Sequence, residues 1–236
     1  AATPAVKLSG NLRTATAQLD ENGKPVDGQI VRGADQIHLQ NVNIHNSFTL
    51  ADKVQMMKDD MAALNRQAAD KLALGQPADG DKGVEAWRKT QTGLLNSKYD
   101  KLKLTGLQID TRTVNPEFDL NTGEFVNNVA TVAPKAANIL LDNLNITLQN
   151  DSVNGTSTAI DLSGKSNHIL VNGGVFDAGS VTGTGAQANA LYITDAGTNN
   201  LIDFNGSVLK GDIRSDAAGN TVNLTNGSLT GNAIAG

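Results

Sequence analysis

Four aspartates lie near the most regularly patterned part of the sequence, and their carboxyl groups are the side chains best suited to catalysis. They are Asp161, Asp177, Asp195 and Asp203. Cleaving a polysaccharide requires a pair of carboxyl groups at a fixed separation, one acting as acid and the other as base or nucleophile. The chain has no Gly-His-Gly element, and its neighbouring Asp59-Asp60 pair falls in a helical run. We therefore interpret these aspartates as structural residues at bends, and we predict no catalytic residue and no enzymatic activity.

The histidines, His38, His45 and His168, have no spacing that would gather them around a metal ion. The chain contains no Cys, which excludes disulfides, thiol nucleophiles and zinc–thiolate sites. Its net charge of -5 argues against a nucleic-acid partner, because nucleic-acid-binding proteins carry an excess of Lys and Arg. We therefore expect no metal site, no cofactor and no nucleic-acid partner.

A pattern of alternating aliphatic residues interrupted by Asn or Gly recurs along the chain. Clear copies are Ile37, Leu39, Asn41, Val42, Ile44; Ile139, Leu141, Asn143, Leu144, Ile146; Ile169, Val171, Asn172, Gly173, Val175; Ile202, Phe204, Asn205, Gly206, Val208; and Val222, Leu224, Asn226, Gly227, Leu229. Alternation indicates strands with one buried face, and Asn and Gly tolerate the left-handed backbone of a sharp bend. Each copy is therefore predicted to be a strand, a corner and a second strand.

Further aliphatic pairs lie between these copies, Ile160 with Leu162 and Leu191 with Ile193, and they fit the third strand of a triangular coil. Repeated coils of this kind are typical of a solenoid, in which each repeat stacks on its neighbours. We predict an all-β solenoid, a right-handed parallel β-helix, with N-terminal rungs in residues 1–46 and its continuation in residues 102–236. Asn side chains stacked at successive corners are predicted to form an internal hydrogen-bonded ladder.

The alternative all-β architecture, a jelly roll or sandwich, would be built from hairpins with tight loops. The sequence shows one good hairpin candidate, in residues 117–126. There Phe118 and Leu120 face Phe125 across Asn121-Thr122-Gly123. We predict that this segment is a β-hairpin protruding from one coil.

Residues 47–101 interrupt the strand pattern with a helical one. Aliphatic and Met residues follow steps of three and four at Leu50, Val54, Met57, Met61, Leu64, Ala68 and Leu72. Thr49 and Asp52 have the spacing of a capping box, in which each side chain bonds the other's backbone N–H. A second helix is expected over residues 82–99, after a break that contains Gly75 and Pro77. The segment is therefore predicted to be an α-helical hairpin inserted between coils.

This helical insertion is the place where the sequence favours specific recognition. Met57, Met61 and Trp87 are predicted to form a partner-binding face, because Met and Trp are enriched at protein interfaces. The alternative is that the same side chains close the helices on each other and onto the coil beneath.

The end of the chain carries a resemblance to a known family. Gly211-Asp212-Ile213 precedes Val222-Asn223-Leu224-Thr225-Asn226-Gly227-Ser228. This arrangement resembles the repeat of bacterial autotransporter passenger domains of the pertactin and self-associating adhesin type, over residues 200–236 and more loosely over 138–199. The resemblance implies a right-handed β-helix displayed outside a Gram-negative cell. It also implies that the chain is a passenger fragment, linked to the outer membrane only through a missing C-terminal barrel.

These observations predict a non-enzymatic, surface-displayed or secreted passenger fragment that mediates adhesion or self-association in virulence. Its partner would be a host glycan, a matrix protein or another copy of itself, bound through extended β-helix faces and the helical insertion by many weak contacts. One alternative is a carbohydrate-active β-helix that binds or cleaves polysaccharide as tailspikes and pectinases do. Against it, the only Trp and Tyr residues available for sugar stacking are Trp87, Tyr99 and Tyr192. The other alternative is a purely structural stalk.

Overall fold

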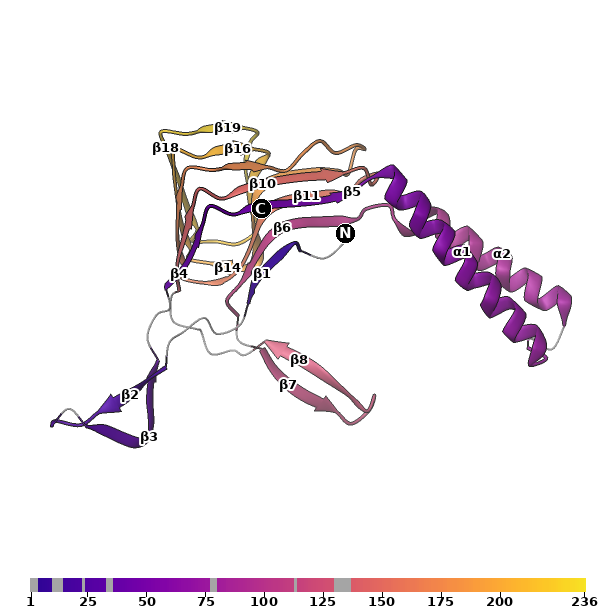
Figure 1. Cartoon of the computed structure of the whole chain (residues 1–236), viewed down its shortest axis with the longest axis horizontal. Coiled ribbons are helices and arrows are strands. Elements are labelled where there is room, and N and C mark those ends of the chain that lie inside the picture. The colour runs from indigo at the N-terminus through magenta and orange to yellow at the C-terminus, as the bar shows by residue number, and fades with distance from the viewer. Residues whose placement is uncertain are drawn as a thin grey trace.

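The computed structural model describes residues 4–9, 15–22, 24–32, 36–76, 80–112, 114–129 and 137–236. Most of the strands in these ranges belong to three parallel sheets, and the remaining elements are two helices and two antiparallel hairpins (Figure 1). The sheets make up the body of the molecule. The helices extend from the body as an arm, and the hairpins project from it separately (Figure 1).

The three sheets are named here by their strands. Sheet 1 contains β1 (Val6–Ser9), β6 (Lys103–Asp110), β11 (Thr156–Lys165), β14 (Gln187–Thr198), β17 (Asp212–Ser215) and β20 (Ala233–Ala235). Sheet 2 contains β5 (Asn43–Phe48), β10 (Asn145–Asn150), β13 (Val175–Asp177), β16 (Val208–Lys210) and β19 (Ser228–Thr230). Sheet 3 contains β4 (Gln36–Gln40), β9 (Asn138–Asp142), β12 (His168–Asn172), β15 (Leu201–Asn205) and β18 (Thr221–Thr225).

Successive segments of the chain pass through sheet 3, sheet 2 and sheet 1 in the same order each time, and each strand pairs in parallel with the matching strand of the next segment. The register aligns equivalent residues of the repeat. Ile169 pairs with Ile139 on one side and with Ile202 on the other, and Ile202 pairs with Val222. The mostly β architecture with parallel sheets that the sequence predicts is therefore confirmed.

The space between the three sheets is filled by one apolar core. The inward residues of sheet 3 are almost fully buried, with Ile169 and Ile202 each 1% exposed, and Leu107 and Leu162 on sheet 1 are fully buried. Burial of a Leu or Ile side chain contributes about 1.5–3 kcal/mol. Because each passage of the chain through the three sheets adds only a few such side chains, the core depends on the pairing of successive passages.

The corner between sheets 3 and 2 has the same backbone conformation at every turn of the repeat. Positive φ angles of 51–71° occur at the equivalent positions, which are Asn41, Asn143, Gly173, Gly206 and Asn226. Gly174, at the next position, leaves no room for a side chain, because a Cβ atom there would lie 2.2 Å from the Leu144 carbonyl oxygen. The Asn and Gly residues of the repeat thus form the bends that the sequence predicts.

The corner between sheets 1 and 3 holds a ladder of asparagine side chains. Asn200 Oδ1 accepts hydrogen bonds of 2.9 Å from both the backbone N–H and the Nδ2 of Asn167. Asn220 Oδ1 in turn accepts bonds of 2.9 and 3.1 Å from the backbone N–H and Nδ2 of Asn200. Asn167 and Asn200 are each 1% exposed. The sequence predicts an internal asparagine ladder at the Asn and Gly bends of the repeat, whereas this one lies at the corner between sheets 1 and 3. It satisfies backbone groups that this corner leaves without strand partners.

The hairpins lie outside the parallel sheets. β7 (Val114–Asp119) and β8 (Glu124–Val129) pair antiparallel, with Phe118 opposite Phe125, as predicted, although the hairpin is longer than 117–126. β2 (Ala15–Leu19) and β3 (Pro25–Arg32) form a second antiparallel hairpin. This corrects the prediction that residues 1–46 are entirely rungs and that the chain has one hairpin. The missed signal is Asn22-Gly23, a dipeptide favoured in hairpin turns.

The helices lie between β5 and β6. α1 (Leu50–Ala73) begins with the predicted capping box, because the Thr49 hydroxyl accepts from Asp52 N–H at 3.1 Å and Asp52 Oδ2 accepts from Thr49 N–H at 2.9 Å. α2 (Asp81–Lys98) runs back along α1 toward the sheets (Figure 1). In the described ranges, no helix is long and apolar enough to cross a membrane.

Candidate binding surfaces

The base of the arm formed by α1 and α2 is fixed to the body by packing and by polar contacts. The Tyr99 ring stacks on the buried Phe48 ring with centroids 6.0 Å apart, and Met56 packs against the main core. The backbone N–H of Leu50, at the start of α1, donates to Asp151 Oδ2, just after β10, at 3.2 Å. Lys53 Nζ, 3.1 Å from Asp100 Oδ1, joins the two ends of the arm. The arm is therefore held by contacts to the core as well as by the chain connections.

Asp60 links the two helices near this base. Its Oδ2 accepts a hydrogen bond of 2.5 Å from the Tyr99 hydroxyl and one of 2.9 Å from Lys98 Nζ. The bond from Tyr99, and then that from Lys98, lower the pKa of Asp60 below its ordinary value of 3.8. The same bond from its hydroxyl to Asp60 is the main cause that raises the pKa of Tyr99 above 10.0.

We expect Tyr99→Phe to loosen the arm while leaving the sheets intact, because it removes the bond to Asp60 and keeps the ring on Phe48. The expected loss is about 0.5–1 kcal/mol, since Asp60 and Lys98 are partly exposed to solvent. Hydrogen exchange of α1 and α2 amides would measure it, with the amides of sheet 3 as the internal reference. Equal exchange rates in the variant and the wild type would contradict the assignment.

The same contacts predict a pH window for arm stability. A lowered Asp60 pKa stabilises the folded arm above pH 3.8, and this contribution is lost as pH falls through the lowered value. The raised pKa of Tyr99 stabilises the folded arm below pH 10.0. This stabilisation is lost as pH rises through the raised pKa. Protection of the arm amides from exchange, corrected for intrinsic rates, should therefore fall at both extremes.

The three predicted partner-binding residues do not share one environment in the arm. Met61 Sδ lies 3.9 Å from the Thr92 hydroxyl of α2, and the Trp87 ring lies under Lys71 Nζ at 4.9 Å. Met61 and Trp87 therefore contact the opposite helix, as the packing alternative expects. Met57 is half-buried on α1. A partner-binding role for these side chains stays a prediction.

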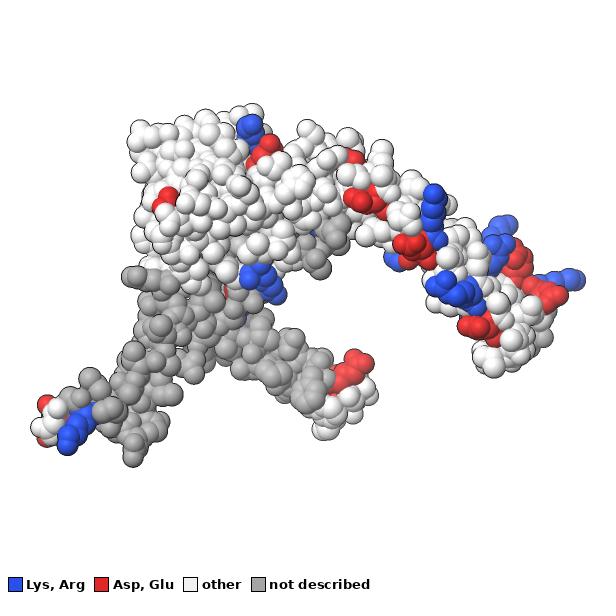
Figure 2. Space-filling model, viewed as in Figure 1, with Lys and Arg blue, Asp and Glu red and all other residues white. Residues whose placement is uncertain are grey.

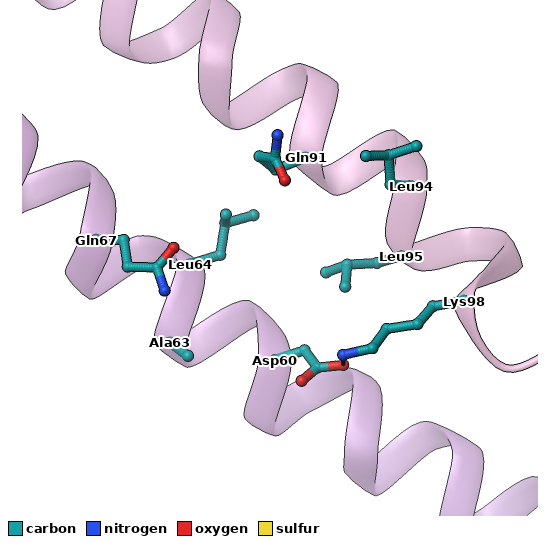
Figure 3. A pocket seen from close by; sticks show the side chains of 8 residues that line it. All are labelled: Asp60, Ala63, Leu64, Gln67, Gln91, Leu94, Leu95 and Lys98. Carbon is teal, nitrogen blue, oxygen red and sulfur yellow. Dashed lines mark hydrogen bonds and ion pairs between the residues drawn. The ribbon is translucent and has the colours of Figure 1, made fainter. Parts of the chain in front are cut away.

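A groove of about 380 Å³ lies between the two helices (Figure 3). Leu64 and Gln67 of α1 and Gln91, Leu94 and Leu95 of α2 line it, together with Ala63, Asp60 and Lys98. In Figure 3 the Lys98 and Asp60 side chains meet at one end of the groove. Its surface is therefore apolar in the middle and polar at the ends.

Several large apolar side chains of the arm are exposed. Leu94 is 61% exposed, Val54 52%, Leu72 47% and Leu74 74%. Figure 2 shows that Lys, Arg, Asp and Glu side chains also gather on the arm, whereas the sheets in this view are mostly free of them. The arm is thus an amphipathic surface that projects away from the sheets.

The four aspartates considered as carboxylate candidates are divided among the three sheets. Asp161 and Asp195 are on sheet 1, Asp177 is on sheet 2 and Asp203 is on sheet 3. They do not line one groove together. All four lie within strands, in β11, β14, β13 and β15, so the prediction that they are residues at bends is wrong.

On sheet 1, the two carboxyl groups that come closest to an acid–base pair are those of Asp161 and Asp110. Asp110 is not among the candidates chosen from the sequence. Burial is the main cause that raises the pKa of Asp161, which is 5% exposed. Burial opposes ionisation of Asp110 as well, but hydrogen bonds from the Arg112 side chain and backbone outweigh it and lower the pKa of Asp110. Asp110 lies on β6 and Asp161 on the adjacent β11.

The outer face of sheet 3 is a regular surface with a defined polar network. Its central column runs in register across the five strands and consists of His38, Leu140, Leu170, Asp203 and Asn223. Asp203 Oδ1 accepts a bond of 2.7 Å from Asn223 Nδ2, and its Oδ2 lies 3.0 Å from His168 Nε2. These partners, Asn223 first and His168 second, lower the pKa of Asp203.

Two hollows adjoin on this face and share Leu170. One, of about 360 Å³, is lined by His38, Leu140, His168 and neighbouring residues, and the other, of about 650 Å³, by Asp203, Asn223 and neighbouring residues. Together they form a shallow groove that crosses the strands.

His38 and His168 both point outward on sheet 3, as the alternation predicts, and His45 is exposed on sheet 2. Over the residues that the structure covers, no group of three or more His, Asp or Glu side chains is arranged to hold a metal ion.

A scan against protein-family models, a search of curated proteins and a search of solved structures each found no match for this chain. Functional inference therefore depends on the surfaces just described.

Sequence reasoning singled out Asp203 and His168 separately, but it did not predict that they contact each other on one face, and it gave no binding role to Leu94. Leu94 fits the helical period, but the sequence does not indicate that its side of α2 stays uncovered. Asp203 is visible as a strand residue, whereas its contacts with His168 and Asn223 depend on the register of three strands. The signal available was only that all three occupy outward positions of the repeat.

Proposed function

We propose that the three parallel sheets form a right-handed parallel β-helix, with the arm inserted in one coil and β7–β8 as a protruding hairpin. The in-register stacking of β9, β12, β15 and β18 supports this proposal. The right hand is the strongly preferred one for a chain that leaves a strand and returns to the same sheet in parallel.

We further propose that this chain is a non-enzymatic passenger fragment of an autotransporter-like surface protein of a Gram-negative cell, and that it mediates adhesion or self-association. The observation that carries the proposal is the arm, which is fixed at its base and exposes apolar side chains such as Leu94 and Leu74 away from the core. Leu94 lines the groove between the helices together with Leu64 and Leu95, and apolar patches of this kind mark interaction surfaces. The sheet faces add a second, extended surface, so that several weak contacts combine.

Displaying the full chain on a non-aggregating bacterial host would test this function. We expect the cells to settle from suspension, or to adhere to immobilised matrix proteins or glycans. Leu94→Glu should reduce that effect about fivefold, because it places a charge in the centre of an apolar contact surface. Leu120→Glu is the matched control, since Leu120 is 88% exposed on the β7–β8 hairpin.

Two outcomes would contradict the proposal. Folded, displayed chain that causes neither settling nor adherence would remove the adhesion function and favour a structural stalk. Release of reducing ends from polysaccharides by the purified chain would favour the carbohydrate-active alternative.

A further inference from the structure

The outer face of sheet 3 combines hydrogen-bonding and apolar groups in a groove that crosses the strands. We propose that this groove binds a neutral oligosaccharide, with Asp203 as its central hydrogen-bond acceptor. The inference rests on the proposed binding function and assigns one ligand class to one of its surfaces.

The Asp203 carboxylate is positioned to accept hydrogen bonds from sugar hydroxyl groups. Asn223 and His168 hold its two oxygens at 2.7 and 3.0 Å, so the carboxylate is fixed before a ligand arrives. A carboxylate has about four acceptor positions, and these two partners leave the others available. The Asp203 side chain is 31% exposed, so solvent and ligands reach it. Hydroxyl bonds to an ionised acceptor are stronger than those between neutral groups.

The apolar part of the groove lies next to this acceptor. Leu170 pairs in register with Asp203 on one side and with Leu140 on the other, and Leu170 is 38% exposed. A sugar ring presents C–H groups on its faces and hydroxyls at its edge, and it therefore suits an apolar platform beside a polar one. The aliphatic pair serves here as the platform that aromatic rings supply in other sugar sites.

The charge of the face selects among sugars. None of the five strands of sheet 3, all within the described ranges, contains Lys or Arg, while Asp142 and Asp203 both occupy outward positions. The basic side chains beside them are His168, 3.0 Å from Asp203, and His38, 3.9 Å from Asp142. Sulfated or carboxylated glycans would meet these two carboxylates without a Lys or Arg on the strands of this face to pair with, which disfavours binding. The groove thus has the charge expected for a neutral ligand.

The dimensions also fit a chain of sugars. Five strands at a spacing of about 4.8 Å span about 19 Å, which accommodates several linked sugars. The two hollows that share Leu170 extend along this direction.

Isothermal titration of the purified full chain with maltohexaose, cellohexaose and mannohexaose, beside heparin as an anionic glycan, would test the inference. At least one neutral hexasaccharide should bind and heparin should not. Asp203→Asn should weaken binding about tenfold, because it replaces a charge-assisted acceptor by a neutral group of the same shape. Leu170→Ala should weaken it about threefold through lost apolar contact. Asp195→Asn, which changes an exposed aspartate on sheet 1, is the matched control and should bind as the wild type does.

Unchanged binding by Asp203→Asn, absence of binding to all three neutral sugars, or binding of heparin alone would overturn the inference. The inference would also be overturned if Asp203→Asn changed the sedimentation of the chain but left its affinity for sugars unchanged. That result would show that this face mediates contact between copies of the chain. If displayed cells still aggregate or adhere while no neutral sugar binds, this inference fails and the proposed adhesion function stands. Denaturant midpoints of all variants would separate loss of binding from loss of fold.

Discussion

Phe204→Ala is expected to lower the free energy of unfolding by about 3–5 kcal/mol, because it removes a large buried side chain and leaves a cavity. Phe204 is 1% exposed and points between the sheets, where its ring meets that of Phe176 edge-on with centroids 5.9 Å apart. Neighbouring coils meet at this ring. Each coil contributes few core residues, so the cavity cannot be closed by rearrangement elsewhere.

Urea unfolding followed by circular dichroism would measure this loss. Leu170→Ala is the control, because Leu170 lies on the adjacent strand but faces outward and is 38% exposed. Its expected cost is below about 1 kcal/mol. If both variants lost similar stability, the assignment of inner and outer faces on sheet 3 would be contradicted.

Asn200→Ala is expected to cost about 3–4 kcal/mol, although it removes only a small polar side chain. It would leave the backbone N–H of Asn167 and the carbonyl of Gly164 without their Asn200 partners, at 2.9 and 3.0 Å. It would also remove one of the two hydrogen bonds of Asn167 Nδ2, which keeps its bond of 2.9 Å to the Thr111 hydroxyl. Each buried group left without a partner costs about 1–3 kcal/mol. The same unfolding measurement applies, and Asn205→Ala, at an exposed position on β15, is the control with little expected effect.

A second substitution at this position separates hydrogen bonding from packing. Asn200→Asp keeps the shape but replaces the Nδ2 donor, which bonds Gly164 and Asn220, by an acceptor. We expect burial to raise the pKa of the introduced carboxyl, so that stability is retained below the ordinary Asp pKa and lost as pH rises through the raised value. A variant as stable at pH 7 as at pH 4, relative to wild type, would show that the ladder is unimportant.

The local features of the fold could be predicted because each follows from residue type and spacing. Asn41, Asn143 and Asn226 mark bends because Asn tolerates a left-handed backbone, and all three have positive φ. The helical period of residues 50–72 matches α1, and Thr49 begins it as a cap. In these places local preference and the final structure agree.

Other features depend on pairing between distant segments. The β2–β3 hairpin was missed because its alternation is weak and resembles that of the coils. The sequence does not distinguish Asp203 from Asp161. Strand register places Asp203 on an open face, whereas Asp161 is only 5% exposed. Met56, next to the predicted Met57, is the methionine that packs on the core, because the direction in which α1 leaves β5 decides which side of the helix faces the body.

The most direct test of the account is whether residues of successive coils lie side by side in solution, and the absence of Cys from the chain makes it simple. Leu140→Cys combined with Leu170→Cys puts thiols at register partners on adjacent strands, about 4.8 Å apart between Cα atoms, within the range for a disulfide. Leu140→Cys combined with Asp203→Cys places them two strands apart, about 9.6 Å, beyond that range. After mild oxidation, peptide mass spectrometry should find the linked peptides in the first variant and not in the second. Linkage in the second variant but not the first, or equal linkage in both, would contradict the stack of parallel coils on which the proposed binding surfaces depend.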